Sequence, residues 1–169
     1  SSKGFEAMHP QDFRYLVRDG KWRKPTSGVC KGYAQGNLAI LPKSVADDFL
    51  LFCVRNPKPC PLLDVIEAGS VKPSVGMDSD IRIDLPRYKV FKNGELVDEP
   101  DHLLGWWRED LVSFLLGCSF SFETALMSAG IRIKHIDLDL RCPVFSTNIE
   151  CKPAGIFSGN MAVSMRPIP

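Results

Sequence analysis

The sequence predicts a layered domain of the α/β or α+β class. Stretches with apolar residues at three- and four-residue spacing predict helices, stretches of alternating apolar and polar residues predict strands, and Asn93-Gly94 is a strong hairpin signal. The strands are linked both by hairpins and by helices, which is typical of such domains. A length of 169 residues suits one domain with an ordinary core, or one domain with a small inserted unit.

Composition narrows the class of protein. Hydrophobic residues make up 44% of the chain and charged residues 24%, as in ordinary globular proteins. The formal net charge is +1 and no basic run occurs, so nothing indicates nucleic-acid binding. The longest apolar run, near residues 111–122, is interrupted by Ser113, Gly117 and two further serines, so we expect no membrane partner.

The six cysteines would suggest disulfides in a small secreted protein. This chain is long enough to bury a core without them, and no C-x-x-C pair occurs. We therefore favour a reducing compartment, the cytoplasm, with the mitochondrial matrix as the alternative. Metal-ligand spacing is absent as well, so neither a metal nor another cofactor is predicted.

Local signals in the first part of the chain predict alternating helices and strands. Pro10 suits the first turn of a helix and Gly20 its end, whereas Ser44 and Asp47 have capping-box spacing. In order, we expect a helix ending at Gly20, a buried strand over 38–41, a helix beginning at Ser44 and an interior strand over 62–66.

Alternation over residues 80–86 predicts a strand with Asp80, Arg82 and Asp84 on one face. That face is either a solvated salt-bridged surface or the wall of a cleft in which Arg82 binds a carboxylate. Further along we expect a hairpin with strands at 87–91 and 95–97, helices over 101–116 and from 122 to 130, a bulged strand over 131–140, and strands over 144–149 and 161–165.

The stretch from Gly117 to Glu123 is predicted to join two helices and to hold the site. The N-terminus of the second helix offers unpaired backbone N–H groups, which favour a small anion or a developing oxyanion. The thiol of Cys118 and the hydroxyls of Ser119 and Ser121 lie beside this helix start. The alternative is that the two serines only cap the helix and pack there.

A glycine-punctuated segment over residues 25–37 is a second candidate. Its glycines allow sharp turns and close approach to a ligand, and Thr26, Gln35 and Asn37 supply neutral hydrogen-bonding groups. The spacing matches no phosphate-binding motif. A plain turn that enters a buried strand is the alternative interpretation.

Several motifs together resemble the D-glutamate cyclase family, whose members are also described as hydro-lyases. The resemblance covers almost the whole chain and rests on Pro25-Thr26-Ser27-Gly28, Gly32 to Leu38, Phe52-Cys53 with Asn56 to Leu63, Asp84 to Tyr88, Gly117 to Glu123, Thr147-Asn148-Ile149 and Val163 to Pro167. It implies an α/β fold with a three-layer αβα core, a mixed sheet and a smaller two-layer α+β unit. Residues 1–169 would form one family domain, with 131–165 in the smaller, β-rich unit.

The resemblance also implies interconversion of D-glutamate and 5-oxo-D-proline with loss or gain of water. Ring closure needs a deprotonated amine, a stabilised oxyanion and a protonated leaving oxygen. We expect Ser119 and Ser121 to hold the oxyanion and Asp84 or Glu123 to move protons, with Cys118 left open as a nucleophile. The substrate would be bound by Arg82, Arg87 or Arg166 as carboxylate clamps and by Thr26, Gln35, Asn37, Tyr88 and Asn148 as orienting groups.

The alternative function is a noncatalytic module that binds a small carboxylate or an amino acid. Bacterial members of the family continue beyond the segment that resembles 163–167 into a His-Gly-Ala-Pro-Val-His-like motif, which this sequence lacks. A truncated family member is therefore one interpretation. The expected partner is the small molecule, with a homodimer left open.

Overall fold

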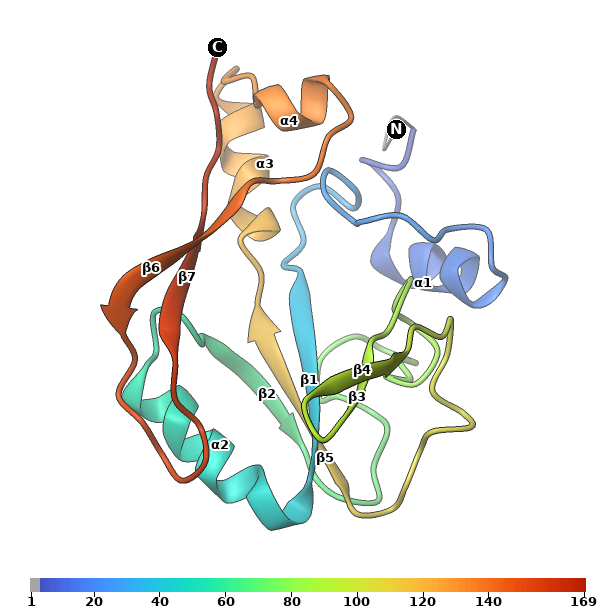
Figure 1. Cartoon of the computed structure of the whole chain (residues 1–169). Helices are drawn as coiled ribbons and strands as arrows, with labels where there is room; N and C mark the ends of the chain where they lie inside the picture. Colours follow the sequence, from blue (N-terminus) through green and yellow to red (C-terminus); the bar gives the residue numbers. More distant parts are fainter. Residues whose placement is uncertain (1–3) are drawn as a thin grey trace.

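The central element is a three-stranded sheet with the order β1-β5-β2 (Figure 1). The computed structural model describes residues 4–169, in which β1 spans Gly36–Pro42, β2 spans Leu62–Ile66 and β5 spans Leu111–Gly117. β5 is antiparallel to both neighbours, so β1 and β2 run in the same direction on either side of it. Helix α2, Lys43–Arg55, connects β1 to β2. Helices and sheets are combined, and the predicted α/β class is confirmed.

The other elements surround this sheet (Figure 1). Helix α1 precedes the sheet, the β3–β4 hairpin lies between β2 and β5, and two short helices and the β6–β7 hairpin follow β5. Their bounds are α1 Pro10–Arg18, β3 Val90–Lys92, β4 Glu95–Asp98, α3 Phe120–Ser128, α4 Lys134–Asp137, β6 Val144–Glu150 and β7 Asn160–Ser164. No helix within residues 4–169 has the length and apolar character needed to cross a membrane.

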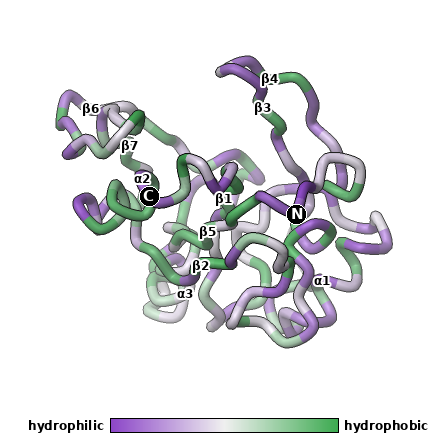
Figure 2. The backbone as a smooth tube through the Cα atoms, turned by 90° about the horizontal axis from the view of Figure 1, so that it is seen from below, coloured by the Kyte–Doolittle hydropathy of each residue, from purple (hydrophilic) through white to green (hydrophobic). Residues whose placement is uncertain are grey.

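The main core forms where α2 covers one face of the sheet. Phe114 of β5 is 1% exposed, and its ring packs edge-to-face on Phe49 of α2 with centroids 4.8 Å apart. Ala46 and Val112 complete the fully buried cluster. Figure 2 shows hydrophobic colours along β1, β5 and β2, and hydrophilic colours at the end of the β3–β4 hairpin.

A second core joins α1 to the segment that leads into β1. Phe13 and Val17 of α1 are buried against Trp22, Val29 and Cys30. The rings of Phe13 and Trp22 meet edge-to-face at 5.3 Å. This cluster fixes the segment 22–30 beside α1, and that segment supplies walls of both cavities described below.

Many elements predicted from local pattern are confirmed. Helix α1 ends just before Gly20, which adopts a φ of 71°, and the hairpin turns at Asn93 and Gly94, both with positive φ. Strand β1, helix α2, strand β2 and the hairpin strands β6 and β7 also lie where the sequence predicted them, although β1 is half-buried and not buried as expected. One detail of α2 is wrong, because Pro42 precedes its first turn and no side chain caps it, so Ser44 is not the cap.

The helix predicted over 101–116 is wrong. The chain forms turns and then strand β5, which is the central strand of the sheet. A central strand is apolar on both faces, so Leu111, Phe114 and Leu115 happen to follow a helical spacing. The junction at Gly117 therefore joins a strand to a helix.

Two predicted strands are wrong as well. Residues 80–86 form turns, because the Asp84 carboxylate accepts a hydrogen bond from Asp80 N at 2.7 Å and so closes the chain on itself. Residues 131–140 contain the short helix α4 instead of a bulged strand. The expected mixed sheet is also wrong in detail, because every strand pair within residues 4–169 is antiparallel. The parallel strands β1 and β2 do not pair, since β5 lies between them.

Phe114→Ala should reduce the free energy of unfolding by about 3–5 kcal/mol, because it removes the ring at the centre of the main core. Urea unfolding followed by circular dichroism would measure the change. Phe91→Ala is the matched control, since Phe91 is 60% exposed on β3 and should change stability by less than about 1 kcal/mol. Equal effects of the two substitutions would contradict this description of the core.

Candidate functional site

A cavity of about 700 Å³ lies between α1, the segment 23–37 and the segment 84–89. We call it the main cavity. Phe120, the first residue of α3, and Arg141 also line it, so the start of α3 adjoins its wall. Its volume is in the range of ordinary small-molecule sites.

The main cavity is rich in positive charge. Its lining holds six cationic side chains and two carboxylates, namely Arg14, Arg23, Lys24, Arg87, Lys89 and Arg141 with Asp84 and Glu99. Some of these charges are already paired: Arg14 with Asp84 at 3.8 Å, Arg23 with Asp101 at 3.3 Å and Lys89 with Glu99 at 3.6 Å.

Three cations of the main cavity remain available to a ligand. Within residues 4–169, no ion pair or hydrogen bond involves the side chain of Lys24, Arg87 or Arg141. Unpaired guanidinium and ammonium groups around a concave site favour anionic ligands, and guanidinium groups bind carboxylates in bidentate fashion. The site is therefore suited to a small carboxylate.

Five of the predicted site residues line this cavity: Thr26, Gln35, Asn37, Asp84 and Arg87. Two of them are used to shape its wall. Thr26 Oγ1 donates to Gln35 Oε1 at 2.6 Å, and Gln35 Nε2 donates to the Thr26 carbonyl at 2.9 Å. The Asn37 side chain, in contrast, has no described partner within residues 4–169. It can therefore orient a ligand.

Asp84 holds the opposite wall. Its carboxylate, 5% exposed, accepts hydrogen bonds from Arg18 and from Asp80 N, and lies 3.8 Å from Arg14 Nε. Tyr88 is buried beneath the same loop, where its hydroxyl donates to the Ile81 carbonyl at 2.8 Å, and burial raises its pKa. Both residues fix the loop that carries Arg87.

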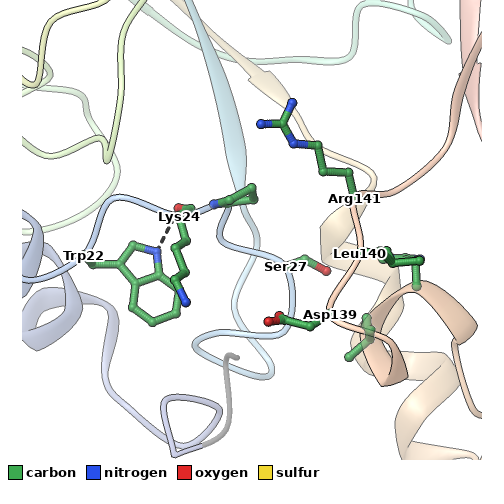
Figure 3. Close-up of a pocket in the computed structure, with 9 residues that line it drawn as sticks. Trp22, Lys24, Ser27, Asp139, Leu140 and Arg141 are labelled. Atoms are coloured by element: carbon green, nitrogen blue, oxygen red, sulfur yellow. Dashed lines mark hydrogen bonds between the residues drawn. The ribbon is translucent and has the colours of Figure 1, made fainter.

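A smaller cavity of about 300 Å³ adjoins the main one, and we call it the side cavity. Lys24, Pro25 and Arg141 line both cavities, so the two meet at these residues. Figure 3 shows Ser27 and Asp139 close to one another in the side cavity, with Lys24 and Arg141 around them. His135 of α4 also lines the side cavity and adds an ionisable ring.

A buried charged network stands behind the side cavity. Glu123 of α3 is 1% exposed, and its Oε1 lies 2.6 Å from Arg166 Nε and 3.2 Å from His135 Nε2. Ser27 Oγ donates to the other carboxylate oxygen at 2.7 Å. A buried carboxylate needs such partners, because an unpaired charge in a low-dielectric interior is costly.

Arg166 connects this network to the start of α3. It donates from Nη2 to Ser119 Oγ at 3.0 Å and from Nη1 to Cys142 Sγ at 2.7 Å. Ser164 Oγ also donates to Ser119 Oγ, at 3.0 Å. Burial raises the pKa of the Cys142 thiol even though Arg166 lowers it, so this sulfur is kept as a neutral thiol.

His135 is a neutral imidazole in this setting. Burial lowers its pKa most, Arg166 lowers it further, and Glu123 raises it. The Glu123 charge is already offset by Arg166, so a protonated ring would add an unbalanced buried charge. The imidazole therefore stays uncharged at neutral pH.

The other predicted site residues lie outside both cavity linings. Ser121 Oγ accepts from Gln35 N at 2.8 Å, and Cys118 N donates to the Gln35 carbonyl at 3.1 Å, so both tie α3 to the wall of the main cavity. Arg82 is paired with Asp80 at 2.7 Å. Asn148 is exposed on β6, away from the network. Ser119, Glu123 and Arg166 come together in the buried network.

Sequence reasoning did not select Lys24, Ser27, His135 or Arg141. Lys24 and Ser27 stand on either side of the Pro25-Thr26 pair that attracted attention, which was the available signal. No group of three or more His, Cys, Asp or Glu side chains within residues 4–169 is placed to hold a metal ion. All six cysteines are free thiols.

The fold and its cavities define an α/β protein with a cavity rich in cationic side chains. A model of the D-glutamate cyclase family matches residues 112–169. The "Putative hydro-lyase YcsI" of Bacillus subtilis is 53% identical over 163 residues, which cover 96% of this chain and 63% of that protein. A "Putative hydro-lyase" of Clostridium beijerinckii is 53% identical over 166 residues, covering 98% of this chain and 63% of the relative.

A similarly named protein of Geobacillus kaustophilus is 53% identical over 163 residues, covering 96% of this chain and 62% of its own length. The resemblance predicted from the sequence is confirmed: this chain is similar to the D-glutamate cyclase family over residues 112–169 and to these hydro-lyase-named proteins over 96% to 98% of its length. It spans 62% to 63% of the length of the relatives compared.

Arg166→Met should reduce the free energy of unfolding by about 3–5 kcal/mol, because it leaves the Glu123 carboxylate buried without its cation. Adding Glu123→Met should recover a large part of this loss, since the double variant buries no charge. Urea unfolding of the four proteins in the cycle would measure both effects.

Arg132→Met is the control. The Arg132 side chain is 73% exposed, so its pair with Asp137 should contribute less than about 1 kcal/mol. A double variant no more stable than Arg166→Met would contradict the pairing.

Acidification from about pH 7 to about pH 5 should reduce the free energy of unfolding through His135. The unfolded chain gains a proton at the ordinary histidine pKa of about 6.5, whereas the folded ring, with its lowered pKa between Glu123 and Arg166, takes up its proton only at lower pH. Urea unfolding at a series of pH values measures this slope. His135→Gln should flatten it and His102→Gln, at an exposed site, should not. An identical slope in both variants would exclude the assignment.

Proposed function

We propose that this chain forms the substrate site of a hydro-lyase that acts on a small carboxylate, and that its reaction interconverts D-glutamate and 5-oxo-D-proline. The main cavity carries this proposal, because Lys24, Arg87 and Arg141 present positive charge to it without ionic partners within residues 4–169. The family model and the names of the relatives support a hydro-lyase as the class of reaction.

The reaction sets two demands on the site. In ring closure, the amine nitrogen of D-glutamate forms a bond to the γ-carboxyl carbon, and one oxygen of that carboxyl leaves as water. The ammonium group loses two protons and the departing oxygen gains two, so the reaction takes up no net proton. The site must therefore hold two carboxylates in a folded substrate and pass protons between two of its atoms.

The arrangement of cations supports a division of labour. Arg87, on the loop held by Asp84 and Tyr88, would bind the α-carboxylate in bidentate fashion. Lys24 and Arg141, where the two cavities meet, would bind the γ-carboxyl and stabilise the oxyanion formed on attack. Asn37 would orient the substrate from the third wall.

The catalytic roles predicted for Ser119, Ser121 and Cys118 stay predictions. The hydrogen bonds of the two serines and of the Cys118 backbone hold Arg166 and Gln35 in place. We therefore expect substitution of these residues to act mainly through the position of the cavity walls.

Arg87→Gln should weaken binding of D-glutamate or 5-oxo-D-proline by roughly tenfold or more, because a charge-assisted pair to a carboxylate is lost. Titration calorimetry measures the dissociation constants, and turnover is followed by the appearance of the other compound. Arg108→Gln is the matched control, since Arg108 pairs with Asp110 and lines neither cavity.

Three results would bear on the proposal. Equal binding by wild type and Arg87→Gln would exclude the main cavity as the site. Binding without conversion of either compound would favour the noncatalytic carboxylate-binding module instead. Conversion by the wild type and slower conversion at low substrate by Arg87→Gln would support the hydro-lyase.

A further inference from the structure

His135 stands where the buried network meets the side cavity. The ring belongs to α4, is 3% exposed and lines that cavity. Its Nε2 lies 3.2 Å from Oε1 of Glu123, and both ring nitrogens are buried without a hydrogen-bond partner within residues 4–169. The two nitrogens differ in that only Nε2 has a charged group beside it. A buried imidazole nitrogen without a partner is unusual in a folded protein, because no hydrogen bond offsets the free energy of its desolvation.

The carboxylate determines which nitrogen carries the proton. A proton on Nε2 faces the negative oxygen of Glu123, and a lone pair at that position would be repelled by it. The neutral ring is therefore the Nε2–H tautomer, and its basic lone pair is on Nδ1. A carboxylate that fixes the tautomer of a histidine base in this way is a recurring catalytic arrangement.

We propose that His135 is the proton-transfer residue of the reaction, acting through Nδ1 on a ligand group that enters the side cavity. Glu123 is then a positioning residue, because it is sealed from both cavities and acts through the ring. This inference rests on the proposed function, since it assumes a carboxylate held at Lys24 and Arg141 beside His135.

The chemistry balances with one such residue. Nδ1 takes a proton from the ammonium group of D-glutamate, the resulting amine attacks the γ-carboxyl carbon, and the imidazolium returns the proton to the departing oxygen. A second proton follows the same route from nitrogen to oxygen as the C–O bond breaks and water leaves. In the reverse direction the neutral ring activates the water that opens the lactam.

Nitrogen NMR of ¹⁵N-labelled histidine tests the ring directly in the unaltered protein. The chain has three histidines, and His9 and His102 are exposed, so they serve as internal references. We expect the His135 signals of a neutral Nε2–H tautomer, and a shift of Nδ1 alone when 5-oxo-D-proline is added to saturation. Glu123→Gln should mix the two tautomers without moving the signals of the reference histidines.

Kinetics of His135→Gln provide the second readout. The variant should lower kcat by about 10²- to 10⁴-fold while the dissociation constant of 5-oxo-D-proline changes little, because the carboxylate clamps remain. His102→Gln should leave both unchanged.

The outcomes separate the two proposals. Normal turnover by His135→Gln, or an Nδ1 signal that ignores bound ligand, would overturn the role of His135 and leave the hydro-lyase proposal standing. A wild-type chain that converts neither compound would overturn the proposed function, and with it this inference, whatever the NMR shows.

Discussion

The buried contact between Glu123 and Arg166 is the constraint on which the site depends. Glu123 belongs to α3, and Arg166 follows β7 near the end of the chain, so the pair joins segments that are distant in sequence. Ser27 and His135 gather around the same carboxylate. Loss of these contacts would leave the Glu123 carboxylate buried without partners, which is costly. The ion pair therefore holds together the segments that line the side cavity.

The main cavity is fixed by a second set of bonds to the same helix. Ser121 and the Cys118 backbone bind both backbone groups of Gln35, and the Gln35 amide in turn holds the Thr26 carbonyl. The start of α3 thus anchors one wall of each cavity. The sequence predicted that the stretch 117–123 holds the site, whereas its described contacts are those of a support for residues that line the cavities.

The fold was predictable where the local pattern depends on one exposed face or on turn chemistry. Helix α1, the β3–β4 hairpin and the βαβ unit of β1, α2 and β2 carry such signals. Strand β5 carries no such signal, because both of its faces are covered and its apolar run fits a helix as well as a strand. The strand predicted over 80–86 is wrong for another reason. The Asp84 side chain accepts hydrogen bonds from Arg18 and from Asp80 N, and these bonds close the segment into turns.

The same distinction applies to the site. Thr26, Gln35, Asn37, Asp84 and Arg87 were selected as polar residues near glycines and turns, and they line the main cavity. Arg141 and His135 carry no local signal, because their positions depend on how α4 and the chain end pack on α3. Residue type identifies candidates near turns, whereas long-range packing decides which of them meet.

Charge links the two cavities in a way that favours proton transfer on binding. The Glu123 charge is balanced by Arg166, burial and Arg166 lower the pKa of His135, and the cations Lys24 and Arg141 line the same cavity as the ring. A carboxylate bound at those cations adds negative charge beside the imidazole and so favours its protonated form. In the proposed reaction the ring would therefore be a neutral base when substrate enters and a better proton acceptor once substrate is bound, which is the order of events that ring closure would require.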